Sequence, residues 1–317
     1  MNKHPVISVI IPFRNEQQVI GALFARLMPI LNNVGMAYEI ICINDGSTDD
    51  TFARLLEEKE KNDNIRIIDL SRSFGKEAAI TSGIDHALGD AVVIMDADLQ
   101  DPPELIADFV AKWQEGWQVV YGVRQSRNQD SLFKRYTAKA FYFIFNRLSD
   151  TSIPQGAGDF RLVDRVVVNA LMQLPEQARF MKGIFAWVGF RQTGIPFDRP
   201  ARPSGESQWP ALRLFGLAFD GIFSFSTVPL RLWTWIGAIT ALMALIYAVF
   251  LILRVVIYGI DVPGYASLMV ALLFFSGAQL VSMGVLGEYI GRIFTESKSR
   301  PLYIINKKVG FADDADS

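Results

Sequence analysis

The 317-residue sequence predicts an α/β fold, in which a mostly parallel sheet has helices on both faces, followed by interfacial helices and two transmembrane helices. In about the first 125 residues, short apolar runs alternate with segments of helical pattern, which is typical of parallel sheets. These runs are almost continuously apolar, as expected of strands buried on both faces. Further on, residues 232–253 and 262–287 contain no Asp, Glu, Lys or Arg. Each run is long enough for a helix that crosses a membrane, which needs roughly 20 residues.

The individual helices and strands are predicted from the spacing of apolar residues and from the residues that end each run. Residues 6–11 are apolar, rich in β-branched side chains and followed by Pro12, so they predict a strand. Val19, Leu23, Leu27 and Leu31 recur at a spacing of four and predict a helix. Further strands are predicted at 39–43, 65–70, 91–95 and 119–123, and further helices at 51–61, 76–88 and 104–115. Helical connections of this length favour parallel strands.

After Arg124 the sequence becomes basic and helical over 132–148, and a further helix–strand region ends near Phe197. A polar, Pro-rich linker at 198–210 precedes a mostly apolar segment at 209–225, which is typical of a helix lying in a membrane interface. We therefore divide the chain into a cytoplasmic α/β domain (1–205), an interfacial amphipathic region (206–230), a two-helix membrane anchor (231–290) and a cytoplasmic tail (291–317).

The distribution of charge predicts the orientation. Basic residues collect before the first uncharged run and after the second, whereas the short link 254–261 has few, which places both termini in the cytoplasm of a multi-pass inner (plasma) membrane protein. The N-terminal apolar run is too short for a signal peptide. Cys42 has no second cysteine to pair with, in agreement with a reducing compartment. The net charge of -2 argues against nucleic acid as a partner.

Polar clusters follow the predicted strands at the edge where ligands of open parallel sheets collect. They are found at 12–16, 44–50, 71–77, 96–101 and Arg124. Five such clusters at one edge of one sheet predict a binding site.

The most informative cluster is 96-DADLQ-100. Asp96 and Asp98 lie two residues apart, so in an extended chain they project to the same side. Oxygen ligands suit Mg²⁺ or Mn²⁺ rather than zinc, and such an ion is commonly completed by substrate phosphates. Asp101 is better explained as part of the cap of the following helix.

The other clusters offer contacts to a nucleotide. Asp45 precedes the turn at Gly46 and could accept hydrogen bonds from a base or ribose, and Glu16 is similarly placed for ribose hydroxyls. Residues 47–51 are better explained as a turn and helix cap. Lys76 is either a solvated cation or a contact to base and phosphate, and we favour the contact. The basic run Arg124, Arg127, Lys134 and Arg135 is either a solvated face or a diphosphate contact.

Together, these motifs resemble glycosyltransferase family 2. The resemblance rests on 12–16, 45-DGSTD-49, 75-GKEAAI-80 and 96-DADLQDPPE-104. With 158-GDFRL-162, 204-SGES-207 and the two C-terminal apolar runs, the sequence is most similar to polyprenyl-phosphate glycosyltransferases, such as dolichyl-phosphate mannose synthases and bactoprenol (undecaprenyl-phosphate) glucosyltransferases. This implies a GT-A type fold, a UDP- or GDP-sugar donor and a polyprenyl phosphate acceptor.

The resemblance also implies residue roles. It places Pro12, Arg14, Glu16, Ile43 and Asp45 around the nucleoside, with Lys76 nearby, Asp96 and Ala97 at the ribose and diphosphate, and Arg124, Arg135 and Arg202 at phosphates. Asp98 and Gln100, with Asp96, would hold the metal, and Lys134 could replace Arg135. The candidate catalytic residues are Asp159, Asp98, Arg124 and Arg135. For Asp159 we expect an orienting or charge-balancing role rather than that of an obligatory base; alternatively it only pairs with Arg161.

The expected activity is inverting transfer of a sugar to undecaprenyl or another polyprenyl phosphate. The segment 222–232 favours glucose, and hence UDP-glucose, whereas a mannosyl- or aminoarabinosyl-type transferase remains an alternative. A processive polysaccharide synthase is disfavoured because no Gln-x-x-Arg-Trp motif is present. A non-catalytic nucleotide-binding membrane scaffold would be expected to have lost Asp96 and Asp98. We also expect a homo-oligomer, because apolar helices of this kind often pack together.

Overall fold

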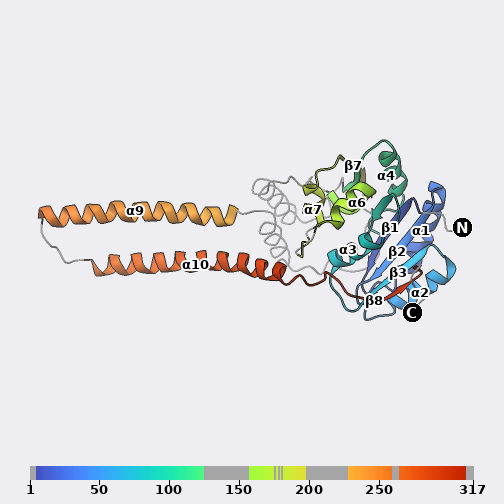
Figure 1. Ribbon diagram of the computed structural model, residues 1–317, viewed down its shortest axis with the longest axis horizontal. Helices are drawn as coiled ribbons and strands as arrows, with labels where there is room; N and C mark the ends of the chain where they lie inside the picture. Colours follow the sequence, from blue (N-terminus) through green and yellow to red (C-terminus); the bar gives the residue numbers. More distant parts are fainter. Residues whose placement is uncertain are drawn as a thin grey trace.

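The structure is a computed structural model that describes residues 5–124, 157–174, 176–177, 179, 181–197, 228–258 and 264–311. Within these ranges the chain forms an 8-stranded sheet in the order β7-β5-β6-β4-β1-β2-β3-β8 (Figure 1). The strands are β1 (Ile7–Phe13), β2 (Tyr38–Asn44), β3 (Ile65–Leu70), β4 (Ala91–Ile94), β5 (Val119–Arg124), β6 (Ala157–Asp164), β7 (Gln192–Phe197) and β8 (Ile305–Val309). The helices are α1 (Ile20–Val34), α2 (Thr51–Lys61), α3 (Lys76–His86), α4 (Leu105–Gln114), α6 (Arg165–Met172), α7 (Met181–Trp187), α9 (Val228–Tyr258) and α10 (Tyr265–Ser297).

The mostly parallel sheet is confirmed. β1 pairs in parallel with both β2 and β4, β2 with β3, and β5 with β7. The exceptions are β6, which lies antiparallel between β4 and β5, and β8, which lies antiparallel beside β3 at the sheet edge. The sequence predicted neither antiparallel strand, because each finds its partner far away along the chain.

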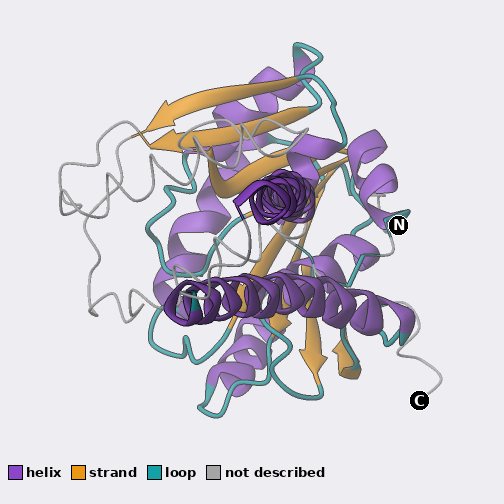
Figure 2. Ribbon diagram, turned by 90° about the vertical axis from the view of Figure 1, so that its left-hand side faces the viewer, coloured by secondary structure: helices purple, strands orange, loops and turns teal. Residues whose placement is uncertain are grey.

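Helices cover both faces of the sheet, as predicted (Figure 2). Side chains alternate between the two faces along each strand. One face of the sheet packs against α1 and α4, which contribute buried residues such as Leu27 and Phe109. The other face packs against α3, α6 and α7, which contribute Ile84, Leu171 and Phe185. The sheet is thus buried on both sides, which explains its continuous apolar strands.

The sequence suggested that the first strand ends before Pro12, but β1 continues to Phe13. Ile10 O accepts a hydrogen bond from Met95 N, whereas Phe13 O accepts one from Asp45 N. Alternate residues of β1 therefore direct their backbone N–H and C=O groups to opposite neighbouring strands, and the backbone nitrogen of Pro12 is directed towards β4. Because β4 has already ended at Ile94, the missing N–H of proline costs no ladder bond there.

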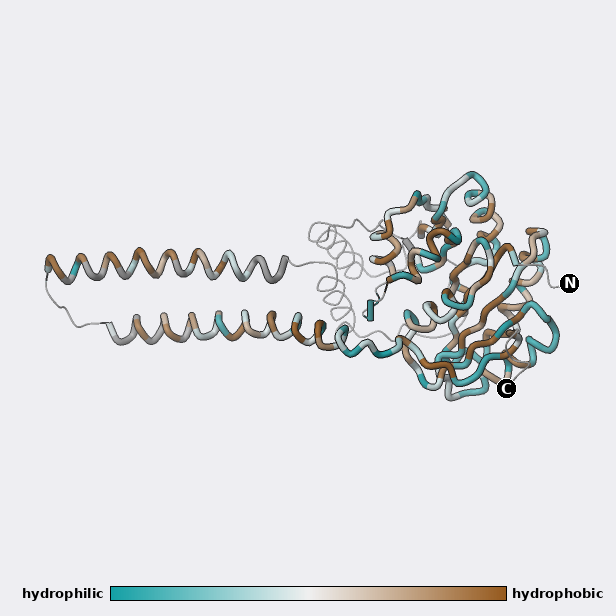
Figure 3. Tube along the Cα trace, viewed as in Figure 1, coloured by the Kyte–Doolittle hydropathy of each residue, from teal (hydrophilic) through white to brown (hydrophobic). Residues whose placement is uncertain are grey.

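The two long helices α9 and α10 extend away from the sheet (Figure 1), and Figure 3 shows many apolar residues along both. In the part of the chain that the structure describes, however, no helix is both long and apolar enough to cross a membrane. The prediction of two transmembrane helices is therefore not supported.

Several predicted segments lie outside the described residues, namely the helix at 132–148, the linker at 198–210 and the interfacial segment at 209–225. The predicted cytoplasmic tail contains a strand, because residues after α10 return to the sheet as β8. This return is fixed by side chains: Tyr303 donates a hydrogen bond to Asp85 (2.8 Å), and Asn306 donates one to Asp69 (2.7 Å). The hairpin is thus joined to the edge of the α/β domain.

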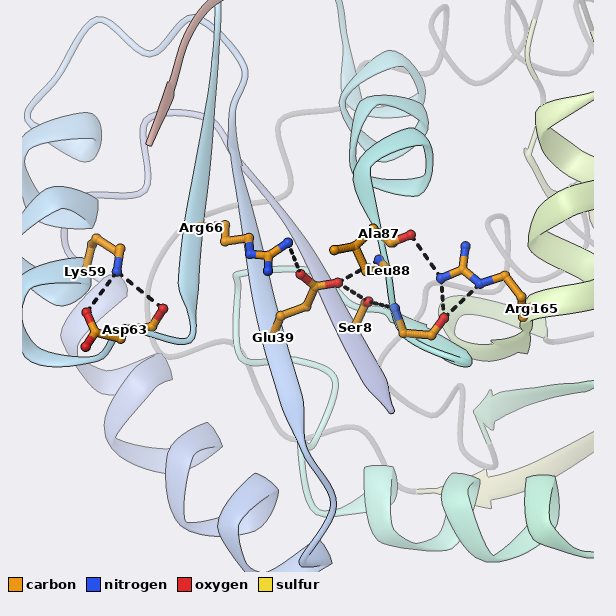
Figure 4. Close-up of polar contacts among 9 residues, drawn as sticks. Ser8, Glu39, Lys59, Asp63, Arg66, Ala87, Leu88 and Arg165 are labelled. Atoms are coloured by element: carbon orange, nitrogen blue, oxygen red, sulfur yellow. Dashed lines mark hydrogen bonds and ion pairs between the residues drawn. The ribbon is translucent and has the colours of Figure 1, made fainter. Parts of the chain in front are cut away.

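A buried carboxylate organises the edge of the sheet where β1, β2 and β4 begin (Figure 4). Glu39 Oε1 accepts hydrogen bonds from Ser8 Oγ (2.5 Å) and Leu88 N (2.7 Å), and Glu39 Oε2 pairs with Arg66 Nη1 (2.6 Å). Ser8 Oγ also accepts from Gly89 N (2.8 Å). The turn between α3 and β4 is therefore held by side chains of neighbouring strands.

Removing this carboxylate should destabilise the domain strongly. We expect Glu39→Ala to lower the free energy of unfolding by about 3–5 kcal/mol, because Arg66 loses its partner and the buried donors lose their acceptor. The measurement is urea denaturation of the full chain. Glu57→Ala removes an exposed carboxylate that pairs with Arg54, and should cost at most about 1 kcal/mol. Equal losses in the two variants would contradict a structural role for Glu39.

Candidate active site

Three charged side chains from three elements meet at the carboxyl edge of β4. Lys76 Nζ, at the start of α3, lies 2.6 Å from Asp96 Oδ1 and 2.8 Å from Asp159 Oδ2. The antiparallel register explains how Asp159 arrives there. Ile94 of β4 is opposite Arg161 of β6, so two residues further on Asp96 comes opposite Asp159. We call Lys76, Asp96 and Asp159 the charged triad.

The charged triad is partly open to solvent, with side-chain exposures of 39% for Lys76, 27% for Asp96 and 34% for Asp159. Burial raises the pKa of Asp96, and so do the charges of Asp159 and Asp98, whereas Lys76 acts to lower this pKa. Burial would lower the pKa of Lys76, but the charges and hydrogen bonds of Asp96 and Asp159 outweigh it and raise this pKa. Lys76 therefore stays protonated at neutral pH, between carboxylates that outnumber it.

The turn after β4 holds Asp98 and Gln100 in a tight conformation. Asp98 Oδ1 accepts a hydrogen bond from Gln100 N (3.1 Å), and Leu99 has a φ of 56°. A left-handed conformation costs a non-glycine residue about 1–2 kcal/mol. The Leu99 side chain packs against the core, which offsets part of this strain. Strained backbone of this kind concentrates at functional sites.

The oxygen donors around this turn suit a cation whose remaining coordination positions are filled by a substrate. Among the described residues, no group of three or more His, Cys, Asp or Glu side chains is placed to hold a metal ion. However, Mg²⁺ commonly takes one or two carboxylates and fills its other positions with water and phosphate oxygens. Asp96 and Asp98 supply the carboxylates. The Gln100 side chain is buried with its amide nitrogen unpaired, and turning the amide would present its oxygen instead. These residues fit an Mg²⁺ or Mn²⁺ ion held together with a diphosphate.

Asp45 is buried and holds the loop before α3. Asp45 Oδ1 accepts a hydrogen bond from Phe74 N (2.7 Å), and Oδ2 accepts from Ser73 Oγ (2.9 Å) and Gly75 N (3.1 Å). The structure thus shows a positioning role for Asp45 that the sequence did not predict. By fixing this loop, Asp45 places Lys76 at the start of the helix.

The other nucleoside and diphosphate candidates come from three parts of the chain. Pro12 is partly buried near the end of β1, Arg14 is exposed, and Glu16 donates its backbone N–H to Thr51 Oγ1 (2.9 Å). The side chains of Ile43 and Ala97 are buried, and Ile43 packs under α3 in the core. The turn predicted within 47–51 is confirmed, because Asp49 Oδ1 accepts from Thr51 N (3.1 Å), but the side chain of Asp50, at the N-cap of α2, makes no capping hydrogen bond.

The candidate phosphate contacts lie at or beyond the limit of the described residues. Arg124 ends β5, but its side chain is not described, and Arg127, Lys134, Arg135 and Arg202 lie outside the described ranges. Their roles stay predictions. The sequence did not predict the ion pair between Lys76 and Asp159, because this pair depends on β6 being antiparallel to β4, and the sequence carries no local signal for that pairing.

Comparison with known families and proteins is consistent with this site. The family model described as glycosyl transferase family 2 matches residues 8–172, and the one described as GtrB C-terminal hairpin matches residues 228–293. The chain is 53% identical over 300 residues to an uncharacterized glycosyltransferase of Synechocystis, covering 95% of this chain and 94% of the relative. It is 42% identical over 302 residues to the bactoprenol glucosyl transferase of Shigella phage SfV, covering 95% and 98%.

Two further proteins are similar to this chain. A prophage bactoprenol glucosyl transferase homolog of Escherichia coli is 41% identical over 301 residues, covering 95% of this chain and 98% of the relative. Glucosyl-3-phosphoglycerate synthase from Mycobacterium tuberculosis, crystallised with Mn²⁺, UDP and phosphoglyceric acid, gives a TM-score of 0.48 at 22% identity, covering 69% of this chain and 76% of that one. A likeness as distant as the latter says nothing about ligands.

Removing the Asp45 carboxylate should loosen the loop that carries Lys76. We expect Asp45→Ala to lower the free energy of unfolding by about 2–3 kcal/mol, because hydrogen bonds to a charged acceptor are lost. The backbone amides of Phe74 and Gly75 should exchange with deuterium much faster, as measured by hydrogen exchange. Asp63→Ala, at a highly exposed position, is the control and should leave both amides unchanged. Unaltered protection of Phe74 and Gly75 in Asp45→Ala would contradict this role.

Proposed function

Because the chain belongs to glycosyl transferase family 2, we propose that it transfers glucose from UDP-glucose to undecaprenyl phosphate, with inversion at the anomeric carbon. The observation that carries the proposal is the charged triad beside Asp98, at the edge of the sheet where a nucleotide is expected. Similarity to bactoprenol glucosyl transferases over 95% of the chain supports glucose and a polyprenyl phosphate.

The donor's diphosphate and the site's carboxylates are both negative, so binding requires positive charge between them. Asp96 and Asp98, with Gln100, would hold Mg²⁺ or Mn²⁺, which when bound neutralises the diphosphate and stabilises the charge that develops on the leaving nucleotide. Lys76 contributes a protein cation at the same place, and Asp96 and Asp159 fix its position. Arg124, Arg135 and Arg202 are proposed to contact phosphates of the donor or the acceptor.

The acceptor needs little help to become a nucleophile. A phosphate monoester has its second pKa near 6 and is largely dianionic at neutral pH. Asp159 lies within hydrogen-bond distance of Lys76, so it balances and orients the ammonium group rather than acting as an obligatory base. With Lys76 oriented in this way, its ammonium group is available to phosphate oxygens at the open side of the triad.

The acceptor's tail requires access to lipid, and α9 and α10 carry apolar side chains that suit it. Trp235, Val256, Tyr258 and Leu268 are at least 65% exposed. Leaving apolar surface in water costs about 25 cal/mol per Å², so these helices gain from an apolar environment. We propose that they associate with the inner membrane, with the α/β domain and both termini on the cytoplasmic side, and that copies of the chain associate through these helices.

Glycosyl transfer is tested with radiolabelled UDP-glucose, undecaprenyl phosphate and purified protein in detergent. We expect label in the organic phase with Mg²⁺ or Mn²⁺, loss of transfer with a chelator, and restoration when the metal is returned. Asp98→Ala should reduce transfer by about 100-fold or more, because charge stabilisation of the leaving group is lost. Asp63→Ala, at an exposed site, should remain active. Transfer from another nucleotide sugar but not from UDP-glucose would overturn the proposed donor.

The role of Asp159 is tested by Asp159→Asn. Loss of the charged partner of Lys76 should reduce kcat by about 10- to 100-fold, equivalent to roughly 1.5–3 kcal/mol for a charge-assisted hydrogen bond. Because the carboxylate orients and does not accept the proton, the shape of the pH–rate profile should not change. Turnover within a few-fold of the wild type would remove Asp159 from the site, and loss of one limb of the profile would instead assign it as a base.

A further inference from the structure

A pocket of about 270 Å³ lies where the chain leaves α10 and returns to the sheet. Its walls come from three segments: residues 72, 74, 77 and 78 around the start of α3, residues 177 and 179 before α7, and residues 300–302 after α10. Figure 1 shows the end of α10 approaching the domain near α3. None of its lining residues belongs to the charged triad. We call it the arginine pocket, because each segment contributes one arginine.

The walls of the arginine pocket carry an excess of positive charge. Arg72, Arg179 and Arg300 line it, against one carboxylate, that of Glu77. Within the described part of the chain, none of these arginines forms an ion pair with a carboxylate at 4.0 Å or less. Outside the lining, Asp85 and Glu176 act on Arg179, and the Glu296 carboxylate accepts a hydrogen bond from Gln177 N. The surplus of positive charge therefore lies with Arg72 and Arg300, against Glu77.

The hydrogen bonds of these arginines do not neutralise them. Arg72 Nη1 donates to Ser73 O (3.1 Å) while its guanidinium lies 4.1 Å from the centre of the Phe74 ring. Arg179 Nη2 donates to Leu174 O (2.6 Å). Carbonyl oxygens carry no net charge, so both guanidinium groups keep theirs. Burial lowers the pKa of Arg179, although Asp85, Glu176 and Tyr303 act in the opposite direction. These groups therefore compensate only part of the hydration that the guanidinium group loses on burial.

The size and the lining residues of the pocket indicate which class of ligand fits it. Pockets for drug-sized ligands enclose roughly 300–1,000 Å³, so the arginine pocket suits a smaller group. Guanidinium forks match the oxygen geometry of phosphate. Pro301 and Leu302 add an apolar wall, and the apolar surface of α10 leads towards this wall. A lipid lying along α10 would therefore place its headgroup at the pocket.

We propose that the arginine pocket binds a phosphate dianion, either on a lipid headgroup or free in solution, with its position after α10 favouring the lipid. The inference does not rest on glycosyl transfer, since neither the donor nor the charged triad takes part in binding. Arg72 and Phe74 belong to the loop that Asp45 holds before Lys76, so a ligand in the pocket contacts the same loop that carries the triad's cation.

The test is a calorimetric titration of the full chain in neutral detergent, without nucleotide sugar. The probes are dihexanoylphosphatidic acid, dihexanoylphosphatidylcholine and inorganic phosphate. We expect saturable binding of dihexanoylphosphatidic acid and a Kd at least tenfold higher in the double variant Arg72→Gln, Arg300→Gln. Both side chains belong to exposed residues, so the variant should fold, which an unchanged melting temperature would verify. Arg54→Gln, on the exposed face of α2, is the matched control and should keep the wild-type Kd.

The three probes separate the sources of the phosphate. Tight binding of dihexanoylphosphatidic acid alone supports a lipid monoester, and equal affinity for inorganic phosphate supports the phosphate site but assigns it to a soluble ion. Equal binding of dihexanoylphosphatidylcholine, which carries no net charge, would overturn the proposal. Absence of saturable binding by every probe, or an unchanged Kd in the folded double variant, would overturn it as well. None of these outcomes depends on whether sugar transfer occurs.

Discussion

The ammonium group of Lys76 is the interaction on which the site depends. Two carboxylates reach it at 2.6 and 2.8 Å: Asp96, just after the parallel strand β4, and Asp159, in the antiparallel strand β6. Without the cation, these carboxylates would repel each other. The bridge therefore holds both in place, at the opening where a second cation and a diphosphate would join them.

Two features at opposite edges of the sheet position the residues of this bridge. At the carboxyl edge, β6 enters antiparallel beside β4, and its register puts Asp159 opposite Asp96. At the other edge, the buried Glu39 holds the turn between α3 and β4. α3 is thus fixed near both of its ends, by Asp45 before its first residue and by the Glu39 network after its last. Lys76 has little freedom to leave the triad.

The sequence predicted the first 125 residues well because local patterns determine them. Each strand and helix there has its own apolar period, and even the error at Pro12 concerns only the length of β1. β6 and β8 were missed because antiparallel pairing with a distant strand leaves no local trace. The prediction of two transmembrane helices is not supported in the part of the chain that the structure describes. Strand ends correctly indicated where Asp45, Lys76 and Asp96 gather, but not which residue each contacts, because the contacts depend on register.

The loop 71–75 is the element that joins the two sites. Asp45 holds its end through Ser73, Phe74 and Gly75, and the backbone N–H of Ser71 donates to Ile304 O (2.9 Å) in the segment that leads from α10 to β8. One end of the loop thus contacts the return from the hairpin, and the other end precedes Lys76. A ligand that binds the loop in only one of its arrangements must favour that arrangement, and through it one position of Lys76. The proposed phosphate in the arginine pocket and the proposed donor beside the charged triad are therefore linked through a single short segment of backbone.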